Sequence, residues 1–505
     1  MFKHNTMIPM KSLFLSAMLF GLAACGGDSR PPRITGEQAE VLGNEIDARM
    51  LEFLEDNSIP GATVAVTKNG RLVLWKGYGQ ADKENRVAMQ PWHRTRIGSV
   101  SKVITAIGAL QLVDSGDIAL DQPVYSSQIS VLWGSTGASQ SPGFIYQPDG
   151  VLNNTGMYLE ALVEAPARLN ASRDNEDETL DIVPAYLNQG SNQANVEEIL
   201  DWASRIQVWH ILSHRAGYLR NGNVSAAREY WGRGENDPLS YAELHAAMLA
   251  GTSLYTIDGI QYRAAPLRFE PNGSRMYSNH GFGLLGLIVS DRSGQSYHDY
   301  IQDNVFKPLG LTDIVDAYTF TGLDSVSYIL ENGEVVRKTN LSTPNLLGLA
   351  AGGWAANARD MARILCGLDT RSDIYQPLVQ ERRLLLPETL ATMNDPDFIL
   401  LENSSKVLGW DSVRRRPKYD AVTKNGAIKS VPGSSRVTKY FYPRMNNVDT
   451  EINVAVLVNL YKENWSPPES LLNDIADIVK DASVPASYDL FDAAYRCVSG
   501  PIITG

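Results

Sequence analysis

The chain has 505 residues, of which 44% are hydrophobic, 9% aromatic and 20% charged. This ordinary globular composition excludes collagen-like chains, coiled-coil rods and wholesale disorder, and the length predicts several domain-sized units or one large enzyme with insertions. The 45 Lys and Arg residues against 57 Asp and Glu residues give a net charge of -12. Nucleic-acid binding needs a basic surface, so we expect no nucleic-acid partner. No apolar run reaches the ~18 residues of a membrane-spanning helix, which argues against a polytopic membrane protein.

The N-terminus has the pattern of an export signal. Lys3 and Lys11 precede an apolar run over residues 13–24, which is too short to span a bilayer but is typical of a secretory signal peptide. The run ends in small residues directly before Cys25, as in the lipobox of bacterial lipoproteins. We therefore predict a signal peptide over residues 1–24 and a lipid anchor on Cys25, with a soluble secreted protein cleaved nearby as the alternative.

The residue after the cysteine bears on the final location. Gly26 follows Cys25. A residue other than Asp at this position resembles the pattern of Gram-negative lipoproteins that are sorted to the outer membrane. We expect an exported, lipid-anchored protein at the outer membrane, facing the periplasm. Residues 25–36 are rich in Gly, Pro and polar residues, which predicts a flexible tether between the lipid and the folded body.

The rest of the chain alternates between helix and strand patterns. Apolar residues at helical spacing predict helices at 37–57, 100–115, 209–213, 241–249, 281–292, 296–308, 361–368, 387–394 and 468–481. Runs rich in β-branched and aromatic residues predict strands at 62–67, 71–77, 419–424, 435–442 and 451–460. Lys68-Asn69-Gly70 separates the first two strands, and Asn-Gly between such runs predicts a hairpin.

The predicted strands come from both ends of the chain. Two near the N-terminus and three near the C-terminus, with helices between them, predict an α+β fold whose sheet is completed by both chain ends. From about residue 121 to 207 the composition shifts to Asn, Ser, Gly, Gln and acidic residues, which predicts a long insertion. We expect one domain over residues 37–485 that carries this insertion, followed by a C-terminal tail over residues 486–505.

Ser99 and Lys102 lie at the start of the helix predicted at 100–115, in the only Ser-x-x-Lys of the chain. Three residues apart on a helix, they share a face, with Cβ atoms about 5–6 Å apart. A serine hydroxyl becomes a nucleophile when a neighbouring base takes its proton, and a Lys shielded from water loses enough pKa to help. The helix N-terminus adds N–H groups where an oxyanion would form. An N-cap serine followed by an exposed lysine is the plain structural alternative.

With this motif in view, the chain resembles the serine β-lactamase and penicillin-binding-protein superfamily. The likeness is to its class C β-lactamase-related branch, which includes D-alanyl-D-alanine carboxypeptidases and family VIII esterases. It extends over roughly residues 40–480 outside the insertion. The blocks that carry it, in order, are Ile59-Pro60-Gly61-Ala62, Gly77-Tyr78-Gly79, Arg96–Lys102, Ile211–Tyr218, Phe269–Gly273, Tyr277-Ser278-Asn279, Pro308–Leu311 and Ala351–Trp354. Blocks in a fixed order are more specific than a single motif.

The resemblance implies a β-lactamase/transpeptidase-like fold, with an antiparallel sheet of about five strands flanked by helices and a helical lobe. It also implies roles for particular residues. Ser99 would be acylated, and Lys102 and Tyr277 would move protons. Asn279 and Lys424 would orient the substrate.

The third motif of the family corresponds here to Lys424-Asn425-Gly426, followed by Ala427. Asn425 replaces the usual hydroxyl residue, which weakens the expectation of β-lactam carboxylate recognition. Residues 67–70 repeat the tetrapeptide of residues 423–426, so a second plain turn is the alternative for this segment. By resemblance, Gly426 and Ala427 would lie at the substrate site, and the backbone N–H groups of Ser99 and Ala427 would form the oxyanion hole.

We therefore predict a serine hydrolase that forms an acyl-enzyme on Ser99 and cleaves a D-amino-acid peptide, a β-lactam or a small ester. A non-hydrolysing penicillin-binding or sensor module of the same fold is the alternative. We expect a small-molecule or peptide substrate, membrane contact through the lipid, no protein partner, and no metal or organic cofactor. His210 and His214 lie four residues apart but lack a third ligand, which favours a structural pair over zinc. Cys366 and Cys497 could form one disulfide or remain two buried thiols.

Overall fold

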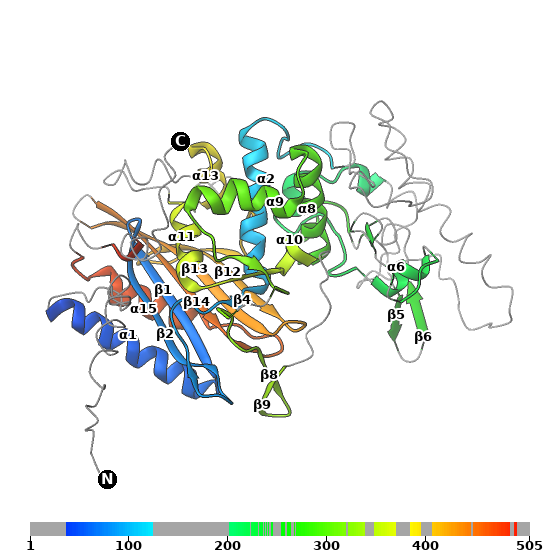
Figure 1. The fold of residues 1–505 in the computed structure, drawn as a ribbon. Coiled ribbons are helices and arrows are strands. Elements are labelled where there is room, and N and C mark those ends of the chain that lie inside the picture. Colours follow the sequence, from blue (N-terminus) through cyan, green and yellow to red (C-terminus); the bar gives the residue numbers. More distant parts are fainter. Residues whose placement is uncertain are drawn as a thin grey trace, which may run out of the picture.

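The computed structural model describes most of the chain outside the N-terminus and the insertion (Figure 1). The described residues are 37–124, 201–222, 224–230, 269–319, 322–338, 348–369, 384–394, 407–445, 448–484 and 489–491, with short pieces between 232 and 267. The predicted signal peptide, Cys25, the tether, most of the insertion, Cys497 and nearly all of the tail lie outside them. The helix predicted at 241–249 is described only in part.

A seven-stranded sheet forms the centre of the described structure, with every neighbouring pair antiparallel. Its order is β11 (Ser412–Arg415), β12 (Asp420–Ile428), β13 (Gly433–Met445), β14 (Val448–Val458), β1 (Gly61–Lys68), β2 (Arg71–Asp82) and β3 (Val87–Ala88). The five predicted strands are confirmed, and short strands β11 and β3 extend the sheet at its two edges. β1 pairs with β14, with Val64 opposite Val456. Both chain ends therefore complete one sheet, as predicted.

The hairpin between β1 and β2 is confirmed at Asn69-Gly70. Lys68 pairs with Arg71, and the two residues between them have φ values of 49° and 77°. Positive φ at both central positions is the type I′ turn that matches the twist of antiparallel strands. The first copy of the repeated tetrapeptide is thus a turn, whereas residues 423–426 lie inside β12.

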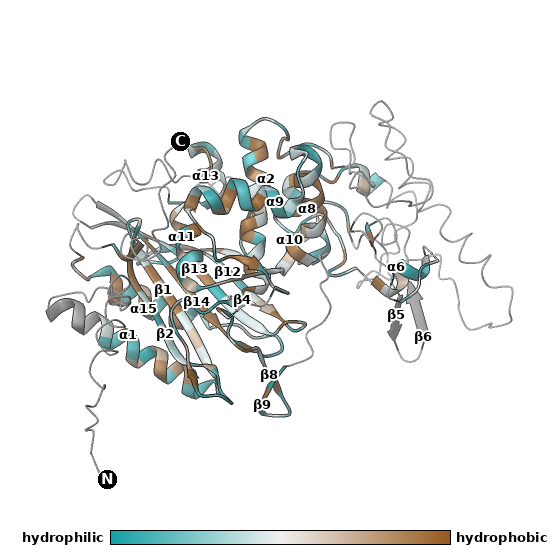
Figure 2. Ribbon diagram, in the orientation of Figure 1, coloured by the Kyte–Doolittle hydropathy of each residue, from teal (hydrophilic) through white to brown (hydrophobic). Residues whose placement is uncertain are grey.

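Helices cover both faces of the sheet (Figure 1). α1 (Glu37–Asp56) and α15 (Glu469–Lys480) share one hydrophobic cluster with Val64 and Val66 of β1, while Ala65 belongs to the cluster of the opposite face. Alternate residues of a strand point to opposite faces, so this central strand is buried on both sides. On the second face lie α11 (Ala358–Cys366), α2 (Ser101–Asp114) and α8 (Asn279–Ser293). Figure 2 shows the predominantly hydrophobic colouring of α2, whose residues are almost all buried.

Shorter elements complete the helical lobe and its surroundings. The helices are α5 (Val208–Leu212), α6 (Val224–Tyr230), α9 (Tyr297–Ile301), α10 (Leu349–Gly352) and α13 (Pro387–Asn394). Small strands form three further sheets: β4 (Thr95–Arg96) with β10 (Trp354–Ala356) and β7 (Val315–Asp316); β15 (Leu460–Tyr461) with β8 (Tyr328–Glu331) and β9 (Glu334–Arg337); and β5 (Leu254–Ile257) with β6 (Ile260–Arg263).

The segment predicted as a helix at 296–308 is helical, but its helix type changes along the chain. After α9 the chain makes a π-helical turn, Gln302–Phe306, and a 3-10 turn, Lys307–Leu309. Pro308 has no backbone N–H to donate to the carbonyl of Asn304, four residues earlier. The side chain of Gln111 donates to that carbonyl instead, at 2.9 Å.

The insertion leaves and re-enters the fold at one place. The Val124 N–H donates to Ile206 at 2.7 Å, and the Val208 N–H donates to Gln122 at 3.2 Å. These backbone bonds close the base of the segment between them, just beyond the C-terminal end of α2. The insertion can therefore vary without interrupting the sheet or α2.

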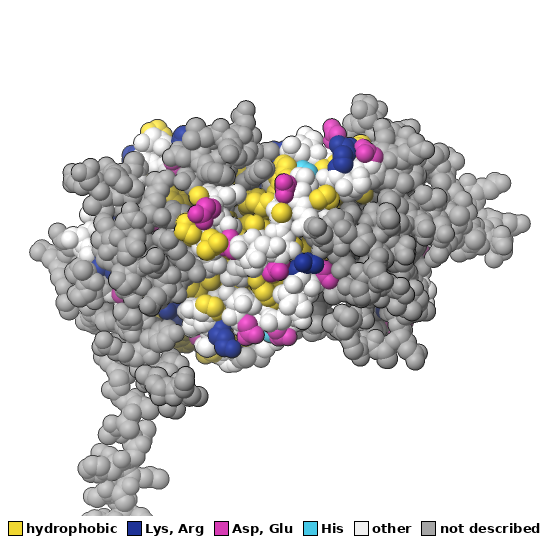
Figure 3. Space-filling view, turned by 90° about the horizontal axis from the view of Figure 1, so that it is seen from above, with side chains coloured by type: hydrophobic (Ala, Val, Ile, Leu, Met, Phe, Trp, Pro, Cys, Tyr) yellow, Lys and Arg dark blue, Asp and Glu magenta, His cyan; other side chains and the backbone are white. Residues whose placement is uncertain are grey.

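On the face seen from above, the described residues present charged side chains of both signs (Figure 3). Acidic and basic side chains lie mixed among hydrophobic and other uncharged groups there, without a large patch of one sign (Figure 3). Among the residues that the structure describes, no helix is both long enough and apolar enough to cross a bilayer.

Candidate active site

Ser99 lies in a tight turn that packs backbone to backbone against β12. The 3-10 turn Gly98–Val100 leads directly into α2. Gly98 has a φ of 53°, and a Cβ there would lie 2.8 Å from the nitrogen of Ala427. A Cβ on Gly426 would lie 2.1 Å from the oxygen of Ile97 and 2.9 Å from the nitrogen of Ser99. The two glycines thus permit a close approach that any larger residue would prevent.

Lys102 is fully buried and points at Ser99. Its Nζ lies 3.1 Å from Ser99 Oγ and 2.7 Å from Asn279 Oδ1, and it also donates to the carbonyl oxygen of Ala351. Burial lowers the pKa of Lys102 to about 8, although the neighbouring Tyr277 opposes this shift. Near pH 7 the lysine is therefore still mostly charged, but the neutral amine is far more populated than for an ordinary lysine and becomes the majority species above about pH 8.

The neutral form of Lys102 has a defined orientation. A primary amine has two N–H donors and one lone pair, and two of the three groups hydrogen-bonded to Lys102 Nζ are carbonyl oxygens, which can only accept. The two N–H groups must therefore serve Asn279 and Ala351. The lone pair is left directed at the hydroxyl of Ser99, which is the arrangement of a general base.

Tyr277 supplies a phenol whose oxygen is buried and has no hydrogen-bond partner among the described residues. Its ring centroid lies 4.9 Å from Lys102 Nζ and 4.8 Å from Lys424 Nζ. Burial alone would raise the pKa of Tyr277, but the two ammonium groups outweigh it and hold this pKa below its ordinary value. An unsatisfied phenol between two lysines can exchange protons with a group entering the site.

Lys424, like Lys102, is fully buried, and it pairs with an acid that the sequence did not reveal. Its Nζ donates to Asp411 Oδ1 at 2.5 Å, and Asp411 Oδ2 accepts from the Asn425 N–H at 2.9 Å. Burial would lower the pKa of Lys424, but Asp411 and Tyr277 raise it above its ordinary value. In return, burial would raise the pKa of Asp411, and Lys424 lowers it. The pair is therefore ionised on both sides.

Asn279 connects the nucleophile to α8. Ser278 caps this helix by accepting from the Gly281 N–H at 2.9 Å, which fixes the first helical residue, Asn279, toward α2. Asn279 Oδ1 accepts from Lys102, and its Nδ2 donates to Asn221 Oδ1 at 2.7 Å. The amide is thus held from both ends.

The ring of His214 packs against the ring of Tyr277, a contact that the sequence block containing His214 did not predict. The two ring centroids lie 4.3 Å apart, and His214 Nδ1 accepts from the Ser278 N–H at 3.2 Å. Burial, aided by Lys424 and Lys102, lowers the pKa of His214 well below its ordinary value, so the ring is neutral. His210 Nδ1 accepts from the Gln207 N–H, as part of the cap of α5. The two histidines therefore have separate partners.

The structure brings together every predicted site residue that it describes: Ser99, Lys102, Tyr277, Asn279, Lys424, Gly426 and Ala427. Cys25 lies outside the described residues. Asp411 could not have been found from one sequence, because an acid 13 residues before its lysine partner forms no local pattern.

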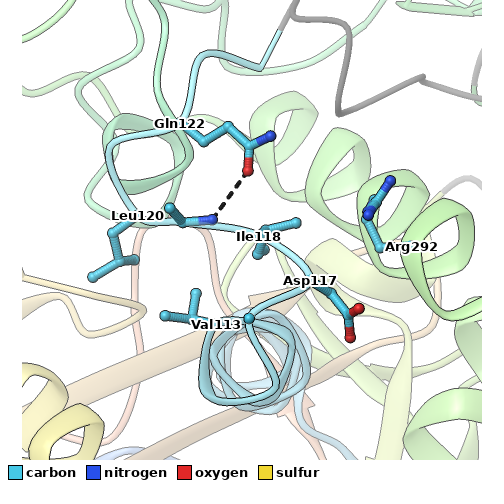
Figure 4. Close-up of a pocket in the computed structure, with 8 residues that line it drawn as sticks. Val113, Asp117, Ile118, Leu120, Gln122 and Arg292 are labelled. Carbon is cyan, nitrogen blue, oxygen red and sulfur yellow. Dashed lines mark hydrogen bonds between the residues drawn. The ribbon is translucent and has the colours of Figure 1, made fainter.

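An open depression of about 770 Å³ lies elsewhere, around residues 113–122 and Arg292 (Figure 4). Figure 4 shows Asp117 near Arg292 at one end of it, and Gln122 accepting from the Ala119 N–H at 3.0 Å. α2 has 14 residues, so this depression lies about 20 Å along the helix from Ser99. It is separate from the cluster around Ser99.

The sheet, the helical lobe and the serine–lysine–tyrosine cluster between them define a β-lactamase/transpeptidase-like protein with a serine hydrolase-type fold. The profile of the Beta-lactamase family matches residues 46–470, and the chain belongs to that family. The predicted family and fold class are confirmed.

Individual relatives are distant. The mouse serine beta-lactamase-like protein LACTB, mitochondrial, is 22% identical over 418 residues, covering 80% of this chain and 72% of the mouse protein. The human protein of the same name matches over 257 residues, only 43% of its length. Among solved structures, EstCE1, described as a hydrolase with promiscuous acyltransferase activity, has a TM-score of 0.54 and 16% identity, covering 87% of this chain and 99% of its own. A class C beta-lactamase has a TM-score of 0.51 and 16% identity, covering 89% and 99%. At these identities the structural likeness shows the fold.

Proposed function

We propose that the protein is a serine hydrolase that forms an acyl-enzyme on Ser99 and cleaves an amide or an ester bond. The observation that carries this proposal is the buried amine of Lys102, which lies 3.1 Å from Ser99 Oγ while carbonyl oxygens occupy its donors. The family membership and the hydrolases among its structural neighbours support the same class of reaction.

The first half of the reaction transfers the acyl group. Lys102 takes the proton of Ser99 as Oγ bonds to the carbonyl carbon of the substrate. The backbone N–H groups of Ser99 and Ala427 stabilise the oxyanion; the close packing at Gly98 and Gly426 supports this, because it brings these two nitrogens near each other. The bond to the leaving group then breaks, and the proton passes from Lys102 through Tyr277 to the leaving nitrogen or oxygen.

The second half restores the serine. Water gives a proton to the Lys102–Tyr277 pair as its oxygen attacks the acyl carbon. The bond to Ser99 Oγ breaks, the carboxylic acid leaves, and Ser99 regains a proton. Asn279 keeps Lys102 in place throughout, because its amide oxygen accepts from Nζ and its nitrogen is anchored on Asn221.

Intact-protein mass spectrometry tests the proposal and its alternative together. The protein is incubated with a neutral aryl ester, with penicillin and with a fluorophosphonate, and the adduct is followed over time. We expect a stable fluorophosphonate adduct, and an ester adduct that forms and decays while the acid product accumulates. Adducts that persist with every substrate would instead favour a non-hydrolysing penicillin-binding or sensor module. Absence of any covalent adduct would contradict acylation altogether.

A further inference from the structure

We propose that Asp411 is a specificity-determining residue that neutralises Lys424, so that the site takes esters or amides uncharged beside the scissile bond and disfavours those with a carboxylate there. This inference rests on the proposed hydrolase function, for which it names the substrate class. It concerns an ion pair in which only Lys424 belongs to a sequence motif, while Asp411 lies outside all of them.

The position of Lys424 is the first step of the argument. It lies two residues before Gly426 on β12, and alternate residues of a strand share a face. Gly426 is the residue that meets the turn of Ser99, so Lys424 lies on the face of β12 that lines the site. Its Nζ is 4.8 Å from the ring centroid of Tyr277, whose oxygen has no hydrogen-bond partner among the described residues. A substrate group beside the scissile bond would come within reach of this ammonium.

The charge of Lys424 is the second step. A fully buried ammonium without a counter-ion would be a strong site for a carboxylate. Here the carboxylate of Asp411 already occupies it, and the second oxygen of Asp411 is fixed by the Asn425 N–H at 2.9 Å. The acid therefore cannot swing away when a substrate arrives. A second carboxylate would meet the negative charge of Asp411 as well as the positive charge of Lys424, so the two contributions largely cancel.

The other charged groups near the site do not supply the positive charge that Asp411 neutralises on Lys424. Lys102 is partly neutral and has its donors occupied. Arg220, whose guanidinium carbon is 5.7 Å from the centroid of Tyr277, and Arg275 are exposed, so solvent screens them. The Asp411 side chain is 22% exposed, so it is not sealed off from solvent. Lys102, Arg220 and Arg275 remain in every variant compared below, and they act on both members of each substrate pair.

The experiment measures kcat/KM for two matched pairs of aryl esters. In each pair, one member carries a carboxylate and the other a carboxamide, on the leaving group in one pair and on the acyl chain in the other. The quantity compared is the ratio of the anionic to the neutral member. We expect Asp411→Asn to raise this ratio about ten- to hundredfold in at least one pair, since it frees the charge of Lys424. Lys424→Gln should lower the ratio.

Two further variants separate charge from geometry. Asp411→Glu keeps the negative charge and should stay within about threefold of the wild-type ratio. The double variant Asp411→Asn, Lys424→Gln has the same net charge as the wild type and should return toward its ratio. An unchanged ratio in Asp411→Asn, or a double variant that behaves like Lys424→Gln, would overturn the proposal.

The rate at which neutral and carboxylate-bearing fluorophosphonates label Ser99 gives a second measurement that needs no turnover. The same order of ratios is expected across the four variants, and their thermal midpoints show whether each has folded. If Ser99 is labelled but the ratios do not respond, the role of Asp411 is refuted while the hydrolase survives. If Ser99 is not acylated, the proposed function fails, and this inference fails with it.

Discussion

The protonation state of Lys102 decides whether Ser99 can act as a nucleophile. Burial in the core between α2 and α8 disfavours the charged form and lowers the pKa of this lysine to about 8, against the opposing influence of Tyr277. Asp411, further away, favours the charged form and so holds this pKa up. The neutral amine becomes the majority species as pH rises through about 8.

From this follows a pH dependence for the proposed reaction. We expect kcat/KM for a neutral ester to rise with pH and to reach half of its maximum near pH 8. Asp411→Asn should move this midpoint to lower pH, because it removes a negative charge that favours the protonated lysine. The measurement is a pH profile of kcat/KM between pH 5 and pH 10 for both proteins. A rate that falls with rising pH, or a midpoint that Asp411→Asn moves upward, would contradict Lys102 as the base.

At this scale the sequence predicted one pair of site residues on physical grounds. Ser99 and Lys102 share a helical face because of their spacing, and the structure places their side-chain atoms 3.1 Å apart. Tyr277, Asn279 and Lys424 followed only from the family resemblance, since no local spacing connects them to Ser99. Asp411 and the support of Tyr277 by His214 depend on tertiary packing, which leaves no periodic signal in one sequence.

Among the elements, the β1–β2 hairpin is hydrogen-bonded to the C-terminal helix α15, which the Asn-Gly turn motif did not predict. Lys68 Nζ donates to the carbonyls of Val479, Lys480 and Ala482, at 3.1, 2.6 and 2.7 Å. These groups lie at and just beyond the end of α15, where carbonyls lack partners within the helix and a cation is favourable. One turn residue thus ties the N-terminal hairpin to the C-terminal helix.

Lys68→Ala should therefore destabilise the fold without affecting the site. We expect the free energy of unfolding to fall by about 1–3 kcal/mol, as charge-assisted hydrogen bonds to α15 are lost. Ester turnover of the folded protein should be unchanged, because Lys68 lies in the tetrapeptide copy that forms a turn. Urea denaturation together with kcat/KM of the same samples checks both statements. Lost activity at unchanged stability would place Lys68 in the site and contradict the assignment.

The elements that the sequence predicted well are long and strongly patterned. The predicted ends agree within a few residues with those in the structure for helices α1, α2, α8, α13 and α15 and for the five long strands. β11 and β3, with four and two residues, are too short to show an alternation. The segment predicted as a helix at 296–308 is helical but changes to π and 3-10 geometry after Ile301, which apolar spacing alone does not reveal.

For the whole molecule, the sheet made from both chain ends places the site between the sheet and the helical lobe. Backbone hydrogen bonds beyond the end of α2 close the base of the insertion. The N-terminal segment enters the fold through α1, which packs against α15 and the sheet face opposite α11. A lipid anchor before α1 would hold the protein by that side. The anchor itself stays a prediction from the lipobox-like residues before Cys25.

Cys25→Ala tests the anchor. In a Gram-negative host we expect the wild-type protein to be labelled by a radioactive or clickable fatty acid and to sediment with the outer membrane. The variant should lose the label and leave the membrane fraction, because one thioether-linked lipid group is all that is proposed to hold it. Retention of the variant in membranes at the wild-type level would refute the lipid anchor.

The most direct test of the central claim is to locate the acylated residue. A fluorophosphonate adduct is formed on the wild type, Ser99→Ala and Ser101→Ala, and its position is found by peptide mass spectrometry. Ser101 is the matched control, since it is two residues away, fully buried, and engaged at Oγ by the Trp354 N–H at 3.3 Å. We predict an adduct on Ser99 in the wild type and in Ser101→Ala, and none in a folded Ser99→Ala. An adduct on Ser101 or on any other serine, or one that survives in Ser99→Ala, would contradict the assignment of the nucleophile.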